Sequence, residues 1–144
     1  NVKGIMKAIK KPKKLGRPKL RPYKNIRKQA WDLQSEWVRR SAKGVCFTCE
    51  DTREWKLQQA GHFIHKNCLD FDLRNIHCQC VKCNKYLSGN LVPYTIGMIE
   101  KYGKEVVDYL RRNSYQVKKF SRSELETMIE DYKAMLKVLD LENG

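Results

Sequence analysis

The stretches Cys46-Phe-Thr-Cys49 and Cys80-Val-Lys-Cys83 are two Cys-x-x-Cys pairs, separated by residues 50–79. Two such pairs supply the four thiolates that a tetrahedral structural zinc site requires, and the two-residue spacing lets both sulfurs of a pair face one ion at about 2.3 Å. A redox function is disfavoured because no thioredoxin-like pattern accompanies the pairs. The sequence therefore predicts one zinc ion held by Cys46, Cys49, Cys80 and Cys83.

The other two cysteines, Cys68 and Cys78, fall outside this spacing. We expect ordinary thiols at both positions, with Cys78 as the alternative if one of the four ligands is replaced. Disulfides are not expected, since reducing pools keep most cysteines of intracellular proteins reduced.

All three histidines of the chain, His62, His65 and His77, lie between the two pairs. A zinc ribbon would usually connect its pairs by a short polar hairpin, so this concentration needs another explanation. Hydrolysis of a phosphodiester needs a base to deprotonate water, a group that fixes the imidazole tautomer, and a divalent cation. The residue types of this segment fit that chemistry. For His65 we favour a purely structural function.

The formal net charge of +14 is unusual for an enzyme of small metabolites and indicates a polyanionic partner, with nucleic acid first. Residues 1–44 carry 15 Lys and Arg against 2 Asp and Glu, whereas residues 45–144 carry 15 against 14. No run of about 18 apolar residues and no secretory leader is visible, so we expect an intracellular protein without a membrane partner.

Residues 1–24 are rich in Pro, Gly and basic side chains and are predicted to form a flexible arm. Such an arm neutralises DNA phosphates and carries little sequence information. The core around Gly16-Arg17-Pro18-Lys19 resembles an AT-hook, but a plain basic linker is the favoured interpretation. The predicted DNA-binding residues are Lys11, Lys13, Lys14, Arg17, Lys19 and Arg21.

Three helical segments are expected from apolar periodicity. Residues 25–44 form an amphipathic helix that ends near Gly44 and leads to the first cysteine pair. Residues 95–112 follow a helical period that Gly103 weakens. A final helix starts at Ser121 or Ser123, each with a Glu three residues later as in a capping box. Its apolar stripe is expected in the core and comprises Leu125, Met128, Ile129, Tyr132, Leu136 and Leu139.

The ordered motifs AGHF, FDLRNIHCQCVKCN and SGNLVPY resemble the NinG family of lambdoid phages, also called Rap. The resemblance covers about residues 46–110. It implies a zinc-bound HNH-type core, also known as ββα-metal or His-Me finger, in which the zinc clamps a short β-hairpin to a helix. It also implies cleavage of branched DNA such as Holliday junctions and D-loops. The implied fold is α+β, with a core at 45–94 and a helical segment at 95–144.

The resemblance also assigns roles to individual residues. His62 matches the histidine that activates water as general base, and Asn75 matches the central asparagine that orients it. Asn84 matches a helix position whose amide oxygen binds the catalytic Mg²⁺ or Mn²⁺. For His77 three roles remain open, namely metal ligand, phosphate contact and packing residue.

One departure concerns Gly61, because many HNH enzymes place an acidic metal ligand immediately before the base. A glycine has no side chain to offer, so the cation must find oxygen elsewhere, and Asp72 is the candidate. A structural hydrogen-bonding role for Asp72 is the equal alternative.

The sequence thus favours a metal-dependent endonuclease for branched DNA. A non-catalytic zinc-containing DNA-binding module is the alternative, and an RNA-directed protein is less favoured because no RNP-like aromatic motif occurs. The resemblance implies the cytoplasm of an infected or lysogenic bacterium as the location. Recombination proteins of phage or host are the expected partners. Symmetric cutting of a two-fold junction would favour a homodimer.

Overall fold

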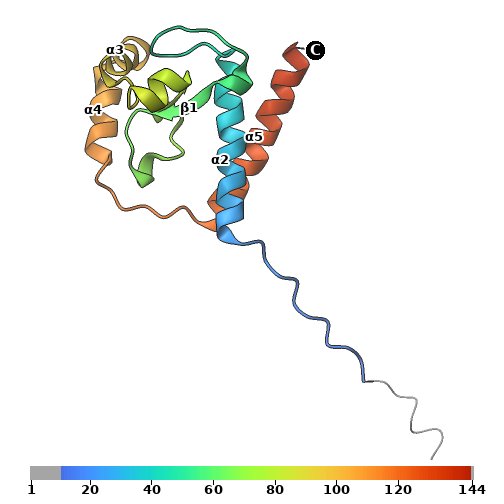
Figure 1. Ribbon diagram of the computed structural model, residues 1–144. Helices are drawn as coiled ribbons and strands as arrows, with labels where there is room; N and C mark the ends of the chain where they lie inside the picture. Colours follow the sequence, from blue (N-terminus) through green and yellow to red (C-terminus); the bar gives the residue numbers. More distant parts are fainter. Residues whose placement is uncertain (1–10, 144) are drawn as a thin grey trace, which may run out of the picture.

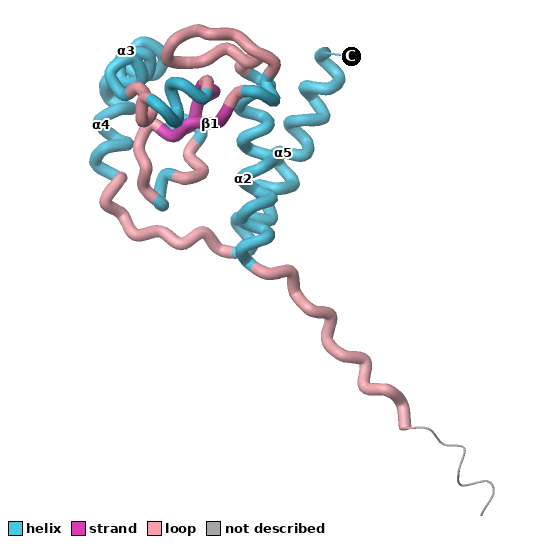
Figure 2. Tube along the Cα trace, in the orientation of Figure 1, coloured by secondary structure: helices cyan, strands magenta, loops and turns pink. Residues whose placement is uncertain are grey.

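The computed structural model describes residues 11–143 and combines helices with a small two-stranded sheet (Figure 1; Figure 2). Helix α2 (Tyr23–Ser41) packs along the C-terminal helix α5 (Arg122–Asn143), while α3 (Leu91–Tyr102) and α4 (Lys104–Asn113) lie on the other side of the sheet. The prediction of an α+β protein is confirmed at this level. Residues 11–22 form neither helix nor strand, and all are exposed. The first ten residues of the predicted arm lie outside the described part.

Helix α2 buries one face, formed by Ile26, Ala30, Gln34 and Val38, at a spacing of four residues. Full burial of an aliphatic side chain such as Ile26 contributes about 1.5–3 kcal/mol. The helix begins directly after Pro22, which has no backbone N–H to donate to a residue one turn earlier. The helix ends at Ser41, three residues before the predicted end near Gly44. Lys43 already has a positive φ of 52°, which an α-helix does not allow.

The sheet is an antiparallel pair of β1 (Gln59–His62) and β2 (Ile76–Gln79). Its register places His62 opposite Ile76 at one end and Gln59 opposite Gln79 at the other. Short 3-10 turns occupy the connection (η2, Asn67–Leu69; η3, Leu73–Asn75), and a third precedes β1 (η1, Trp55–Leu57). A single π-helical turn, η4 (Lys82–Tyr86), follows β2.

The segment predicted as one helix over residues 95–112 is two helices. Gly103 separates α3 from α4 and has φ 90°, a conformation that other residues adopt only with strain. Helix α3 also starts earlier than predicted, at Leu91. The capping box of α5 forms at Ser121: the Ser121 Oγ accepts from Glu124 N–H at 3.1 Å, and Glu124 accepts from Ser121 N–H at 2.8 Å.

Two apolar clusters flank the hairpin. The first joins α2, α5 and the loop after β1, and the second joins that loop to α3 and α4. Four residues of the predicted α5 stripe are buried, which confirms it as core: Leu125, Ile129, Tyr132 and Leu136. Among residues 11–143, no helix has both the length and the apolar character that crossing a bilayer requires.

Candidate functional site

The four predicted metal ligands converge. Cys46 and Cys49 lie in the turn after α2, and Cys80 and Cys83 lie at the end of β2 and in η4. Their Sγ atoms all lie within 4.8 Å of one another, and those of Cys49 and Cys80 are 3.7 Å apart. A tetrahedron with zinc–sulfur bonds of about 2.3 Å has edges of about 3.8 Å. The cluster can therefore hold a metal ion such as zinc.

Neighbouring groups already point hydrogen-bond donors at these sulfurs. The backbone N–H of Cys83 donates to Cys80 Sγ at 3.4 Å, and Asn90 Nδ2 donates to Cys83 Sγ at 3.5 Å. Burial alone would raise the pKa of Cys46, but hydrogen bonds from Thr48 and nearby backbone groups lower that pKa to about 6. At Cys49 and Cys80 burial prevails and raises the pKa, so a metal ion would have to displace their protons on binding. A thiolate at neutral pH is the form that binds metal.

Cys68 and Cys78 are not part of this cluster, as the spacing predicted. Cys68 Sγ donates to the Asn113 carbonyl at 3.3 Å. Cys78 is buried, and the burial raises the pKa of its thiol to about 11. The alternative in which Cys78 replaces a ligand has no support in this geometry.

His62 closes β1, at the end of the hairpin opposite to Cys80. Its Nε2 lies 3.0 Å from the carbonyl oxygen of Asp70, and its ring stacks on Trp31 with centroids 4.8 Å apart. Because a carbonyl oxygen only accepts, Nε2 carries the hydrogen and Nδ1 of the neutral ring is an unprotonated acceptor. The imidazole is therefore fixed in one tautomer.

An open pocket of about 390 Å³ adjoins His62. Asp70, on its rim, forms an ion pair with Arg27 of α2 at 2.5 Å, and the Arg27 guanidinium lies 5.0 Å from the Phe71 ring. Arg27 thus holds the residue whose carbonyl orients His62. The pocket is lined by Lys24, Arg27, Lys28, Trp31, His62, Asp70 and Phe71.

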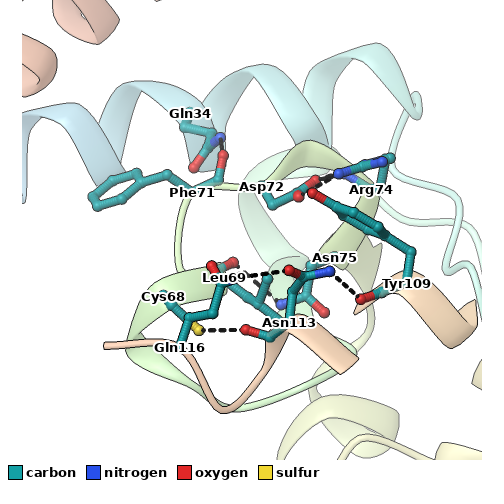
Figure 3. A network of polar contacts seen from close by, with 10 residues as sticks. All are labelled: Gln34, Cys68, Leu69, Phe71, Asp72, Arg74, Asn75, Tyr109, Asn113 and Gln116. Carbon is teal, nitrogen blue, oxygen red and sulfur yellow. Dashed lines mark hydrogen bonds and ion pairs between the residues drawn. The ribbon is translucent and has the colours of Figure 1, made fainter. Parts of the chain in front are cut away.

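Asn75 is fully buried and fastens the loop that follows His62. Its Oδ1 accepts from the Ile64 N–H, and its Nδ2 donates to the Ile64 carbonyl, both at 2.9 Å. Nδ2 also donates to the Leu69 carbonyl at 3.2 Å (Figure 3). These bonds fix the backbone on both sides of the turn that follows His62, and the Asn75 side chain bonds to Ile64 and Leu69.

The Asp72 carboxylate is engaged by a single neighbour (Figure 3). Its two oxygens accept from Arg74 Nε at 3.1 Å and Nη2 at 2.8 Å, and Oδ1 also accepts from the Arg74 N–H. This arrangement caps η3 and gives Asp72 the structural role that was the alternative. Service as a cation ligand would require the ion pair to open.

His77 is buried and uses both ring nitrogens. Tyr94 OH donates to the Gly61 carbonyl at 2.7 Å, so it accepts from His77 Nδ1–H at 3.0 Å. His77 Nε2 in turn accepts from Tyr102 OH at 2.8 Å. Burial, reinforced by the charge of Lys101, lowers the pKa of His77 to about 3. Of the three roles considered, this geometry supports packing.

The side-chain oxygens of Gln79 and Asn84 lie close to Gly61, near the end of β1. A Cβ at Gly61 would lie 1.9 Å from Gln79 Oε1 and 2.9 Å from Asn84 Oδ1. Asn84 Nδ2 donates to Gln59 at 2.8 Å, which leaves its Oδ1 facing Gly61. Gln79 Oε1 is buried and has no hydrogen-bond partner within residues 11–143. Since successive strand residues face opposite sides, these oxygens and His62 approach β1 from opposite faces.

Sequence reasoning missed Trp31, Arg27 and Gln79. A weak sequence signal for Trp31 was its position off the four-residue period that forms the buried face of α2. In the structure its side chain is half buried. Arg27 lay in no motif, and Gln79 lay within FDLRNIHCQCVKCN without a role assigned to it. His65, by contrast, is exposed, and its ring centroid is 6.0 Å from that of His62.

Residues 3–142 match the family described as Bacteriophage Lambda NinG protein. The chain belongs to the NinG family. It is 32% identical to Protein ninG of Escherichia phage lambda over 136 residues, which is 83% of this chain and 64% of that protein. Against Protein ninG of Salmonella phage P22 the identity is 32% over 131 residues, 79% of this chain and 63% of that protein.

Protein ninG of Escherichia phage 933W is 36% identical over 105 residues, 61% of this chain. The chain spans about half to two thirds of the length of these NinG relatives, from 51% to 64%. No solved structure matches it.

Proposed function

We propose that this NinG protein is a metal-dependent endonuclease that hydrolyses phosphodiester bonds in branched DNA, such as Holliday junctions and D-loops. The observation that carries the proposal is the 3.0 Å contact between His62 Nε2 and the Asp70 carbonyl beside an open, basic pocket, a contact that in the neutral ring leaves Nδ1 as the acceptor. A general base needs this combination of one fixed and one available nitrogen.

In the proposed reaction His62 Nδ1 takes a proton from the attacking water. The positive charge that develops on the ring is stabilised by the Asp70 carbonyl, which the Arg27 ion pair holds in place. Asn75 keeps the following loop from shifting, because it bonds to the backbone at two points. The resemblance to HNH nucleases implies 5′-phosphate and 3′-hydroxyl products.

The residues around Gly61 fit a divalent cation in part. Asn84 Oδ1 and the unpartnered Gln79 Oε1 are neutral oxygen donors, and Mg²⁺ prefers oxygen ligands with retained waters and substrate phosphates. A bound Mg²⁺ or Mn²⁺ would supply charge stabilisation for the phosphate and the leaving oxygen. Asn84 is the residue of this chain that we expect to hold it, with Gln79 behind it. Because both oxygens lie on the face of β1 opposite to His62, the proposal requires the scissile phosphate to lie beyond the end of β1, where both faces can be reached.

In this proposal the four-cysteine centre is a scaffold. It lies at the Gln79 end of the hairpin, and His62 lies at the other end, about three residues or roughly 10 Å along the strand. A zinc ion there would join the turn after α2 to β2 and η4 without contacting the reacting groups.

One observation favours the alternative, a DNA-binding module without catalysis. Around the end of β1, Asp70 and Asp72 are each paired with an arginine, and Gly61 offers no carboxylate. A cation would then have to rely on the DNA phosphate for negative charge.

A cutting assay decides between the two. A synthetic four-way junction and supercoiled DNA are incubated with the protein and Mg²⁺, Mn²⁺ or EDTA, beside His62→Ala and the matched control His65→Ala. We expect cation-dependent cutting that His62→Ala reduces by about 10²–10⁴-fold and His65→Ala leaves nearly intact. Full cutting by His62→Ala would overturn the mechanism, and binding without cutting by the unaltered protein would establish the alternative.

A further inference from the structure

One face of α2 forms a wall of the His62 pocket. Lys24, Arg27, Lys28 and Trp31 recur at spacings of three and four residues, so they share one side of the helix, and all four line the pocket. The family resemblance assigned no function to this face, and of its four residues only Lys24 fell within the predicted arm, residues 1–24.

The cations on this face differ in how they are paired. Arg27 is committed to Asp70. Lys28 pairs with Asp32 at 2.6 Å, but the two side chains are 75% and 54% exposed. Such a surface pair contributes only about 0–1 kcal/mol, so a phosphate can replace the carboxylate. Lys24 is exposed and has no ion pair or hydrogen bond with the described residues.

The arm leads straight onto this face. Residues 11–22 are exposed and lead directly into the first turn of α2 (Figure 1). Basic groups therefore continue from the arm through Lys24 and Lys28 and stop at His62. Residues four apart on a helix are separated by roughly 6 Å along its axis. DNA advances about 3.4 Å per nucleotide in one strand, so two flexible lysines at this separation can reach neighbouring phosphates.

We propose that Lys24 and Lys28 bind backbone phosphates of the DNA strand that passes His62, so that α2 sets the position of the phosphodiester at the imidazole. Trp31 stacks on His62 at the end of this row of basic residues. Positioning a phosphodiester at His62 matters only if the proposed endonuclease function holds, and to that extent the inference rests on it. The phosphate contacts of Lys24 and Lys28 themselves require no cutting.

Binding is measured first, in EDTA, by fluorescence anisotropy of a labelled four-way junction at several salt concentrations. The double variant Lys24→Ala/Lys28→Ala removes one exposed unpaired lysine and one lysine in a surface ion pair. The control Lys133→Ala/Lys137→Ala does the same on α5, where Lys133 pairs with Glu130 at 3.5 Å. Both variants lose the same net charge.

The slope of log affinity against log salt should fall in magnitude by about 2 in the Lys24/Lys28 variant and stay unchanged in the control. Equal slopes in the two variants would refute the contacts. Lys24→Arg/Lys28→Arg should restore the slope, because Arg also binds phosphate, and failure to do so would mean that charge is not the cause. Thermal unfolding should not differ between the variants, since both lysine pairs are exposed.

A second measurement tests the position. On adding a short DNA duplex, the NMR signals of the His62 ring should shift in the unaltered protein and in the control, and should shift much less in Lys24→Ala/Lys28→Ala. Unchanged His62 signals during binding would place the phosphates elsewhere and sink the inference. If the unaltered protein proves unable to cut, the proposed endonuclease function fails, while the salt slopes and ring signals still decide this inference.

Discussion

The four-cysteine centre and the His62 pocket lie at opposite ends of one hairpin and are built in different ways. The centre is assembled by two short turns, each of which carries its pair of ligands with two residues between them. The pocket is assembled by contacts between α2, β1 and the loop after β1. Local turn geometry thus brings the four sulfurs together, and tertiary packing shapes the place where we propose the chemistry occurs.

The largest test of this division is removal of a ligand. Cys83→Ser should abolish folding of the core, because apparent zinc-binding free energies of about 10–16 kcal/mol in small zinc domains are comparable with the total stability of a domain. Metal content and circular dichroism measure the result. Cys68→Ser is the control, since Cys68 lies outside the four-sulfur cluster and its thiol donates to the Asn113 and Ser114 carbonyls. A folded, metal-free Cys83→Ser protein would show that the centre is dispensable.

The next test acts between the two regions. Gly61→Ala places a Cβ within 1.9 Å of Gln79 Oε1 and should cost about 1–3 kcal/mol as the hairpin adjusts. The free energy of unfolding in urea measures this cost. Gly16→Ala serves as the control, because nothing lies within 4 Å of its Cβ position. Equal stability of the two variants would mean that the end of β1 is more yielding than its contacts indicate.

The smallest expected effect is a change in pH dependence. His77 has a pKa lowered from 6.5 to about 3 in the folded protein, so the unfolded chain binds the extra proton first as pH falls. The contribution of neutral, buried His77 to the free energy of unfolding is complete above pH 6.5 and is lost as pH falls towards 3. The slope in that window is at most about 1.4 kcal/mol per pH unit.

His77→Gln should flatten this part of the stability curve while it lowers stability at neutral pH. Denaturant unfolding between pH 4 and 7 gives the comparison. Tyr102→Phe, which removes one hydrogen-bond partner and leaves the imidazole in place, should keep the slope. An unchanged slope in His77→Gln would assign the acid sensitivity to another group.

The sequence predicted the metal cluster well because ligand spacing is local. The helices were also predictable, although the end of α2 and the break at Gly103 depend on single backbone conformations that periodicity does not report. The surroundings of His62 were not predictable. Trp31 contacts His62 from helix α2, and Asp70 contacts it from the loop after β1. No sequence pattern in either segment predicts these contacts.

The same limit applies to Asp72 and His77. Each is a residue type that metal sites use, and each is engaged by neighbours, Arg74 in one case and two tyrosine hydroxyls in the other. Residue type alone could not separate these roles. The partners of His77 lie 17 and 25 residues away, whereas Arg74 is only two residues from Asp72 but pairs with it through a turn that the sequence did not predict.

The segment between the two cysteine pairs, residues 50–79, contains every histidine of the chain. An ion held by both pairs would close this segment into a loop even before the helices pack. For a loop of this length, such a crosslink removes conformational entropy from the unfolded chain worth roughly 3–4 kcal/mol. Asn75 and the Ile64 and Leu69 backbone groups that it binds would then meet within a short closed loop, so metal uptake should accelerate folding as well as stabilise the folded state.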